Sequence, residues 1–470
     1  MPKLHIAIIG TGSGAFAAAI KAVEEGATVT LIEGADDIGG TCVNVGCVPS
    51  KIFIQGAHTS YLQSHHQFEG VPLNTPKVNR KVMMLQQQEW VNKLRYAKYE
   101  SILENNPGIN LIRGMAAFKD TETLVVTNKD NQQSEIKADR ILIAVGASAA
   151  VPAIKGLSDS PYWTSTDALQ AESIPEHLIV LGASVVALEL AQAFSNIGSK
   201  VTIIARSTLL SKEEPEIGIE LSKLLVNQGI NLLLNTNTEL VTQNNDNFTI
   251  QTSNGKITGD KLLVATGRTP NTEYLNLAKV GVNTNQQGGI IINEYMQTNV
   301  TNIYAAGDCT NQPQYVYVAA AAGTRAARNM TSTTDCCKVA IDLSVMPSVV
   351  FTHPQVATVG FTEQQAKDNG LDVDSRMLAL ENVPRAIANM NIDGFIKLVI
   401  NNETKQILGC QILAENAGEM IQTAALAIRN KMTVTELADQ LYPYLTMVEG
   451  IKLCAQTFNK DVSQLSCCAG

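Results

Sequence analysis

Two segments of the chain share one pattern of hydrophobic and polar positions. Residues 4–33 contain an apolar run, a glycine turn, a stretch of small residues and a second apolar run, and residues 178–206 repeat this order with the same spacing. The pattern predicts a strand, a helix and a second strand, with a nucleotide at the turn between the first strand and the helix. We therefore expect two dinucleotide-binding units in an α/β fold.

The rest of the chain divides around these units. A helical stretch near residues 76–105 interrupts the first unit's domain, and TSTTDCCK at 331–338 has the composition of a linker. We predict a first nucleotide domain in two parts, residues 1–150 and 272–340. The second nucleotide domain is predicted to cover residues 151–271, and a C-terminal α+β domain residues 345–470.

In the first unit, the three positions of the G-x-G-x-x-G/A motif are Gly10, Gly12 and Ala15. The first allows a tight turn, the second lets the backbone approach a pyrophosphate, and the small third residue packs helix against strand. Glu33 ends the second strand, where a carboxylate can accept hydrogen bonds from a ribose hydroxyl. Strand, helix and terminal acid together predict a bound dinucleotide.

In the second unit, Gly182, Ser184 and Ala187 occupy the same three positions. The residue that matches the terminal acid is Ala205, and Arg206 follows it. Loss of the acid and gain of a guanidinium suit a 2′-phosphate, so we expect NADPH rather than NADH. Two nucleotide sites in one chain indicate one tightly held flavin and one exchanging nicotinamide.

Composition and charge narrow the class of protein. The net charge of −9 argues against binding to nucleic acid or anionic lipid. The sequence contains no run of eighteen apolar residues, so we expect no membrane span. The chain enters its first strand without a leader peptide, so we expect a cytoplasmic protein whose nine cysteines form no structural disulfide framework. Isolated Cys309, Cys410 and Cys454 are expected to be small buried hydrophobic residues.

A close pair of cysteines lies in the segment GGTCVNVGCVPSK, at 39–51. We predict that Cys42 and Cys47 lie in the first turns of one helix, because two glycines and a threonine precede them. A helix N-terminus stabilises thiolates and lowers their pKa, which favours exchange between disulfide and dithiol. The pair is therefore predicted to be redox-active.

With these motifs, and with ATGRTPN, YAAGDC and VVFTHPQVATVG further along, the sequence resembles the pyridine nucleotide-disulfide oxidoreductases over essentially its whole length. The resemblance implies two Rossmann-like domains, for FAD and NADPH, and a C-terminal dimerisation domain of a homodimer whose subunits share active sites. Cys47 would face the flavin as the thiolate, and Cys42 would meet the substrate. Further residues near FAD would be Thr41, Lys51, Ala116, Asp308 and Val316.

Near its end the chain departs from the disulfide-reducing members of that family. Those members carry HPTxxE, whose histidine shuttles a proton to the leaving thiolate, whereas this chain has LYPYLTMVEG at 441–450. Glu449 is present, but Tyr444 replaces the histidine. A phenol with a pKa of about 10 is a poor proton shuttle at neutral pH, so we expect slow disulfide reduction.

The chain ends in FNKDVSQLSCCAG, with Cys467 and Cys468 on a polar tail. Neighbouring thiolates bind soft metal ions such as Hg(II), whose reduction needs two electrons and no proton from a histidine. The tyrosine and the tail resemble the members of the family that reduce Hg(II). The resemblance implies that the tail delivers Hg(II) as a thiolate complex to Cys42 and Cys47 of the partner, past Tyr99 and Tyr444.

Some of these members begin with an additional metal-capturing domain, which this sequence lacks, so we expect the tail to collect the metal. The linker pair Cys336 and Cys337 has no place in the family pattern, and an incidental pair is favoured over a secondary metal site. Two other functions stay open: a disulfide reductase with an unusual proton donor, and a thiol-rich metal buffer that has kept a flavoprotein fold.

Overall fold

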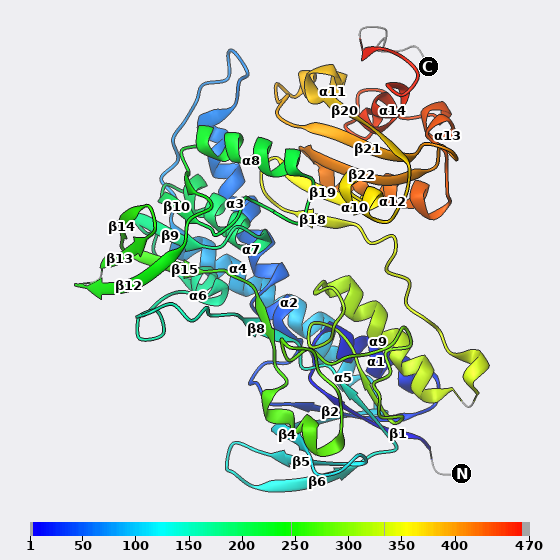
Figure 1. Cartoon of the computed structure of the whole chain (residues 1–470). Coiled ribbons are helices and arrows are strands. Elements are labelled where there is room, and N and C mark those ends of the chain that lie inside the picture. The colour runs from blue at the N-terminus through cyan, green and yellow to red at the C-terminus, as the bar shows by residue number, and fades with distance from the viewer. Residues whose placement is uncertain (1–2, 246, 333, 463–470) are drawn as a thin grey trace.

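The computed structural model describes residues 3–245, 247–332 and 334–462. Figure 1 shows a lower domain, a second domain at the left and a C-terminal domain at the upper right. None of the helices in these described ranges is both long enough and apolar enough to span a membrane.

The first domain is built on a five-stranded parallel sheet, in the order β17-β7-β1-β2-β3. The strands are β1 (His5–Ile9), β2 (Thr28–Glu33), β3 (Ile109–Arg113), β7 (Arg140–Ile143) and β17 (Ile303–Ala305). The last strand shows that the chain returns to this sheet after the second domain. A three-stranded antiparallel sheet adjoins it: β4 (Met115–Phe118), β5 (Thr123–Thr127) and β6 (Gln133–Lys137).

Two helices of small residues, α1 (Ser13–Glu24) and α9 (Val316–Thr331), pack closely in the first domain. A Cβ atom at Gly323 would lie 2.0 Å from the carbonyl oxygen of Gly14, so the two backbones touch where no side chain fits. The helical segments between β2 and β3 are α2 (Gly40–Asn44), α3 (Cys47–His65), α4 (Arg80–Arg95), a π-helix (Tyr96–Glu100) and α5 (Ser101–Glu104). Two 3₁₀ helices, Glu273–Leu275 and Leu277–Val280, precede β17.

The prediction that both cysteines lie in one helix is wrong. Cys42 lies in α2 and Cys47 begins α3, because the backbone leaves the helical conformation at Val45 and Gly46. A Cβ at Gly46 would lie 2.9 Å from the carbonyl oxygen of Thr41, so the chain passes its own preceding turn too closely for a larger residue.

The second domain has a parallel sheet in the order β11-β10-β9-β15. Its strands are β9 (His177–Leu181), β10 (Lys200–Ile204), β11 (Asn231–Leu233) and β15 (Lys261–Val264), and its helices are α6 (Ser165–Gln170), α7 (Val185–Asn196) and α8 (Pro215–Asn227). An antiparallel sheet of β12 (Thr238–Asn244), β13 (Asn247–Thr252) and β14 (Gly255–Gly259) adjoins it. The pair β8 (Ala147–Ala149) and β16 (Arg268–Pro270) forms the double crossing between the two domains.

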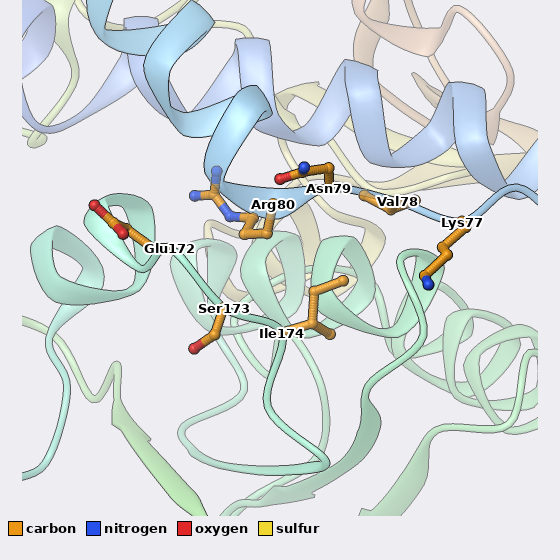
Figure 2. A pocket seen from close by; sticks show the side chains of 7 residues that line it. All are labelled: Lys77, Val78, Asn79, Arg80, Glu172, Ser173 and Ile174. Carbon is orange, nitrogen blue, oxygen red and sulfur yellow. The ribbon is translucent and has the colours of Figure 1, made fainter.

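A hollow of 410 Å³ lies where the start of α4 meets the loop after α6 (Figure 2). Arg80 is buried beside it, donates to the carbonyl oxygen of Leu169 at 2.7 Å and lies over the Phe53 ring at 4.3 Å. These contacts join α3 and α4 of the first domain to the second. The hollow contains none of the predicted site residues, and Arg80 stabilises the junction between domains.

The C-terminal domain is an antiparallel sheet in the order β18-β19-β22-β21-β20, with helices packed against it. The strands are β18 (Ser348–Val350), β19 (Gln355–Gly360), β20 (Val373–Ala379), β21 (Phe395–Asn401) and β22 (Ile407–Ala414). The helices are α10 (Glu363–Asp368), α11 (Pro384–Ala388), α12 (Ala417–Arg429), α13 (Val434–Asp439) and α14 (Glu449–Gln456).

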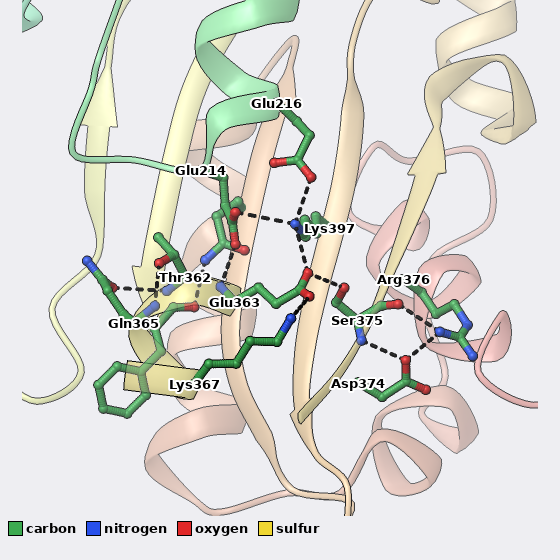
Figure 3. Close-up of polar contacts among 12 residues, drawn as sticks. Glu214, Glu216, Thr362, Glu363, Gln365, Lys367, Asp374, Ser375, Arg376 and Lys397 are labelled. Carbon is green, nitrogen blue, oxygen red and sulfur yellow. Dashed lines mark hydrogen bonds and ion pairs between the residues drawn. The ribbon is translucent and has the colours of Figure 1, made fainter. Parts of the chain in front are cut away.

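A buried ion network attaches this domain to the second (Figure 3). The Lys397 ammonium lies 3.3 Å from Glu214 and 3.0 Å from Glu216, both at the start of α8, and 3.3 Å from Glu363. Removal of Lys397 would leave the carboxylates at this junction without the cation that they share. The predicted fold class, two Rossmann-like domains followed by an α+β domain, is confirmed.

Candidate active site

The turn between β1 and α1 forms a cradle without side chains. Gly10 has φ +107°, and a Cβ there would lie 2.4 Å from the carbonyl oxygen of Ala144. A Cβ at Gly40 would lie 2.6 Å from the Cα of Gly12. No side chain caps α1, so its first amide groups can donate to a phosphate, and buried Ala15 lets the helix pack on the sheet.

Glu33 ends β2 beside this cradle. One carboxylate oxygen accepts the hydroxyl of Thr11, and the other accepts the backbone amide of Ala35 at 2.8 Å. Both bonds orient the carboxylate at the carboxyl end of the parallel sheet, where a ribose would lie. The cradle, the uncapped helix and the oriented acid together fit a dinucleotide.

The other residues that the family resemblance assigned to FAD lie in five different segments of the chain. Thr41 is exposed on α2, Lys51 lies on α3, Ala116 is buried in β4, Asp308 follows β17, and Val316 begins α9. The carboxylate of Asp308 lies 3.3 Å from the Arg268 guanidinium, and burial raises the pKa of that carboxyl.

The second unit repeats the cradle with different residues at its rim. Gly182 has φ +123°, a Cβ there would lie 2.3 Å from the carbonyl oxygen of Ala265, and no side chain caps α7 after Ser184. Ala187 is buried like its counterpart in α1. Beyond β10, Ala205 is buried and Arg206 is exposed, and among the described residues this guanidinium makes no hydrogen bond or salt bridge. An available cation at this position suits a 2′-phosphate.

The two redox cysteines are unequal. A hydrogen bond between their side chains lowers the pKa of Cys47 to about 7 and raises the pKa of Cys42 far above its usual range. The positive charge of Lys51 and a backbone amide at the start of α3 also lower the pKa of Cys47. At neutral pH this arrangement favours a Cys47 thiolate beside a protonated Cys42.

Lys51 leads to a residue that the sequence analysis missed, Glu189. The two side chains form a salt bridge of 2.7 Å, and the second oxygen of buried Glu189 accepts the backbone amide of Phe351 at 2.9 Å. Glu189 therefore connects α3, α7 and the C-terminal domain at the redox centre. In the sequence, Glu189 is a single acidic residue within the apolar helical segment LELAQAF, and this feature could have indicated a buried charge.

Tyr99 lies in the π-helix between α4 and α5, an irregularity that is frequent at functional sites. Its ring packs edge-on against Phe16, with centroids 4.8 Å apart, and its hydroxyl lies 3.4 Å from that of Ser13. Burial raises the pKa of Tyr99, and its electrostatic interaction with the cysteine pair raises that pKa further. The structure therefore brings Tyr99 together with the cysteine pair.

Tyr444 and Glu449 lie in the C-terminal domain, before and at the start of α14, which Figure 1 shows well separated from α2. Tyr444 is 53% exposed, whereas buried Glu449 accepts the backbone amide of Leu445 at 3.1 Å. Leu445 has φ +56°, so the carboxylate holds a strained turn beside the tyrosine.

The seven remaining cysteines divide into three groups, one of which is the exposed linker pair Cys336 and Cys337. Cys309, Cys410 and Cys454 are fully buried, as predicted for small hydrophobic residues, and burial raises the pKa of each. Cys467 and Cys468, the predicted delivery pair, lie outside the described residues.

Two nucleotide cradles on either side of a dithiol define a pyridine-nucleotide-dependent oxidoreductase. The family model described as pyridine nucleotide-disulphide oxidoreductase matches residues 4–323, and the model of that family's dimerisation domain matches residues 346–455. The chain therefore belongs to the pyridine nucleotide-disulphide oxidoreductase family. FAD and NADPH are its cofactors, and its C-terminal domain is the family's dimerisation domain.

Within this family, the chain is similar to mercuric reductases. It is 57% identical to that of Shewanella putrefaciens over 99% of this chain and 83% of that protein, and 56% identical to that of Acidithiobacillus ferrooxidans over 100% and 85%. Among solved structures, the Cu(II) complex of the HOCl-induced flavoprotein disulfide reductase RclA from Escherichia coli has a TM-score of 0.88 and 28% identity. That match covers 98% of this chain and 100% of that chain.

Proposed function

We propose that this chain reduces Hg(II) to Hg(0) with electrons from NADPH, and the names of its mercuric reductase relatives support reduction of mercuric ion. The observation that carries the proposal is the polarised pair of Cys42 and Cys47, in a chain that matches those relatives over its whole length. Bound FAD would supply two-electron transfer between NADPH and sulfur. The overall reaction balances as NADPH and Hg(II) giving NADP⁺, a proton and Hg(0).

The residues have separate tasks in this proposal. Glu33 orients the ribose of FAD, and Arg206 neutralises the 2′-phosphate of NADPH. Lys51, held by Glu189, keeps Cys47 ionised, so that a soft ion meets one thiolate and one thiol. Hg(II) binds when the sulfurs of Cys42 and Cys47 displace two thiolate ligands from the metal, and one of these ligands leaves as a thiol with the proton of Cys42.

The partner subunit completes the site in this proposal. The separation of α14 from α2 within one chain supports a site shared across the dimer, with the partner subunit's Tyr444 facing Tyr99 and the cysteine pair. Glu449 then acts as a positioning residue for the Tyr444 turn. We assign Cys467 and Cys468 the delivery of Hg(II) from the partner's tail. We assign the enzyme to the cytoplasm, the compartment in which thiols stay reduced.

The direct test is Hg(II)-dependent oxidation of NADPH with release of Hg(0). Deletion of residues 466–470 should abolish turnover in excess small thiol, whereas NADPH should still bleach the flavin. Turnover that survives the deletion would contradict delivery by the tail. Stoichiometric metal binding without turnover would instead show a metal buffer.

Disulfide reduction is the second candidate, because the RclA protein is described as a flavoprotein disulfide reductase. Rapid reduction of glutathione disulfide or lipoamide, with no response to Hg(II), would favour it. Tyr444→His restores an imidazole at the place of the family's proton shuttle, so this variant should reduce disulfides faster than the parent chain.

A further inference from the structure

Cys336 and Cys337 form a second exposed pair of thiols, outside the redox site. They lie in a 3₁₀ turn (Asp335–Cys337) of the linker between α9 and β18, which crosses from the first domain to the C-terminal domain (Figure 1). Their sulfur atoms are 3.8 Å apart. Adjacent side chains of a strand point to opposite faces, so the tight turn is what brings these two sulfurs together.

The turn is held both at its tip and at its base. At the tip, the hydroxyl of Thr334 lies 3.3 Å from the sulfur of Cys336 and 3.2 Å from that of Cys337. At the base, buried Asn329 accepts the backbone amide of Val339 at 2.7 Å and donates to its carbonyl oxygen at 3.1 Å. The linker therefore presents both thiols on one side of an anchored turn.

The spacing of the sulfurs lies in the range that a shared metal ion requires. Metal–sulfur bonds of about 2.3 Å, the length found at zinc, place two tetrahedral sulfur ligands about 3.8 Å apart and two linear ones about 4.6 Å apart. A disulfide needs about 2.05 Å. The observed 3.8 Å equals the tetrahedral spacing, and rotation of two exposed side chains can open it to the linear one.

We propose that Cys336 and Cys337 bind one soft, thiolate-seeking metal ion at the enzyme surface, separately from the redox pair. Thiolate ligands select soft ions over hard ones, and the choice of Hg(II) as the ion rests on the proposed function. In the binding step, Hg(II) held by two small thiolates exchanges both for Cys336 and Cys337. Two metal–sulfur bonds form, two break, and the two cysteine protons leave on the displaced thiols, without oxidation or reduction.

Native mass spectrometry of the full-length, FAD-loaded protein tests this site. The protein is prepared with Cys42 and Cys47 as a disulfide and exposed to Hg(II) in excess monothiol. The parent chain should retain one more mercury per subunit than Cys336→Ser/Cys337→Ser. Either single serine variant should lose the same ion, because one thiolate has no chelate advantage over the monothiol in solution.

Ser332→Ala is the matched control, since it alters the same turn but keeps both thiols, and it should keep the ion. The variant Cys467→Ser/Cys468→Ser should also keep it, which separates the linker pair from the tail. Equal mercury content in the parent and in the linker-pair variant would overturn the proposal. Loss of two hydrogens from the pair without metal uptake would also overturn it, by showing a disulfide instead.

NADPH-driven Hg(II) reduction is measured on the same proteins as a separate readout. The linker-pair variant should keep its turnover, because these cysteines lie outside the redox site. Retention of the additional ion by a chain without turnover would uphold the linker site and reject the proposed function. Full turnover with no additional ion would reject the linker site and uphold the proposed function.

Discussion

The two βαβ units are alike where their strands begin. In both, the first residue of the first strand is a histidine whose Nε2 lies close to a threonine hydroxyl on the next strand, at 2.9 Å for His5 and Thr30 and 2.8 Å for His177 and Thr202. The backbone amide of each histidine also donates to an aspartate, at 2.8 Å for Asp139 and 2.6 Å for Asp260.

The units differ where their strands end. The first has Glu33, oriented by Thr11, whereas the second has buried Ala205 followed by exposed Arg206. In α/β sheets a ligand binds at the carboxyl ends of the strands. The comparison therefore teaches that one end of each unit builds a common frame, while the other end selects the nucleotide.

The helices of the two units differ as well. Small residues of α1 meet α9, but α7 carries buried Glu189 and Gln192, whose side chains bind the backbone of Phe351 and His353 in the C-terminal domain. The second unit thus binds a nucleotide and also anchors the domain that follows it.

Alanine at the turn glycines should have the largest effect and should separate the two cradles. Each Cβ would collide with a carbonyl oxygen at a positive φ. Strain of about 1–3 kcal/mol plus this collision should weaken one nucleotide on the order of 100-fold. Gly10→Ala should lose flavin, measured by absorbance, whereas Gly182→Ala should keep flavin and lose NADPH binding. Loss of flavin from both variants would contradict two independent cradles.

Exchange of the rim residues should change the nucleotide preference. Arg206→Ala removes a charge-assisted contact and should reduce the preference for NADPH over NADH by about 10-fold, expressed as the ratio of kcat/KM values. Ala205→Glu with Arg206→Ala copies the first unit and should favour NADH. Glu33→Gln is the control, which should leave this ratio unchanged.

Removal of the Lys51 charge should shift the titration of Cys47. The pKa of Cys47 is about 7, below that of an ordinary thiol, so its thiolate is present above pH 7 and is lost as the pH falls through 7. Lys51→Met should raise that midpoint by about one unit. The ultraviolet absorbance of the thiolate in reduced protein measures this midpoint, and Lys93→Met, at an exposed lysine of α4, is the control. An unchanged midpoint would mean that the thiol–thiol hydrogen bond alone sets the pKa.

Alanine at the two histidines should have the smallest effect. His5→Ala and His177→Ala each remove the hydrogen bond between the ring and a threonine hydroxyl, and His5→Ala also removes the contact with the carbonyl oxygen of Lys137. Each variant should lower the free energy of unfolding by about 1 kcal/mol. Neither should alter the NADPH to NADH ratio. If either variant selectively lost one nucleotide, this would contradict the conclusion that the starts of the strands stabilise the unit and their carboxyl ends select the nucleotide. Thermal unfolding and nucleotide kinetics on the same samples measure both.

Much of this protein could be predicted because the responsible residues are neighbours in sequence. A glycine turn between an apolar strand and a small-residue helix depends on a few consecutive residues. Both units, and the residues that end their second strands, could therefore be predicted from the sequence. The single helix predicted for Cys42 and Cys47 was wrong, because the backbone breaks at Gly46 against its own preceding turn. Local composition indicates a helix well but does not show where such a close contact interrupts it.

The sequence by itself determined the two nucleotide frames, the family and the presence of a reactive cysteine pair, since each depends on short, regular spacing. The family resemblance named Cys47 as the thiolate, but only the tertiary structure gives the physical reason, which is the contact between two helices and the charge of Lys51. The tertiary structure also decided the role of Glu189, which is 138 residues from Lys51 in the chain and 2.7 Å from it in space. Electrostatic interactions act over a few ångströms, and only packing brings such distant residues within that range.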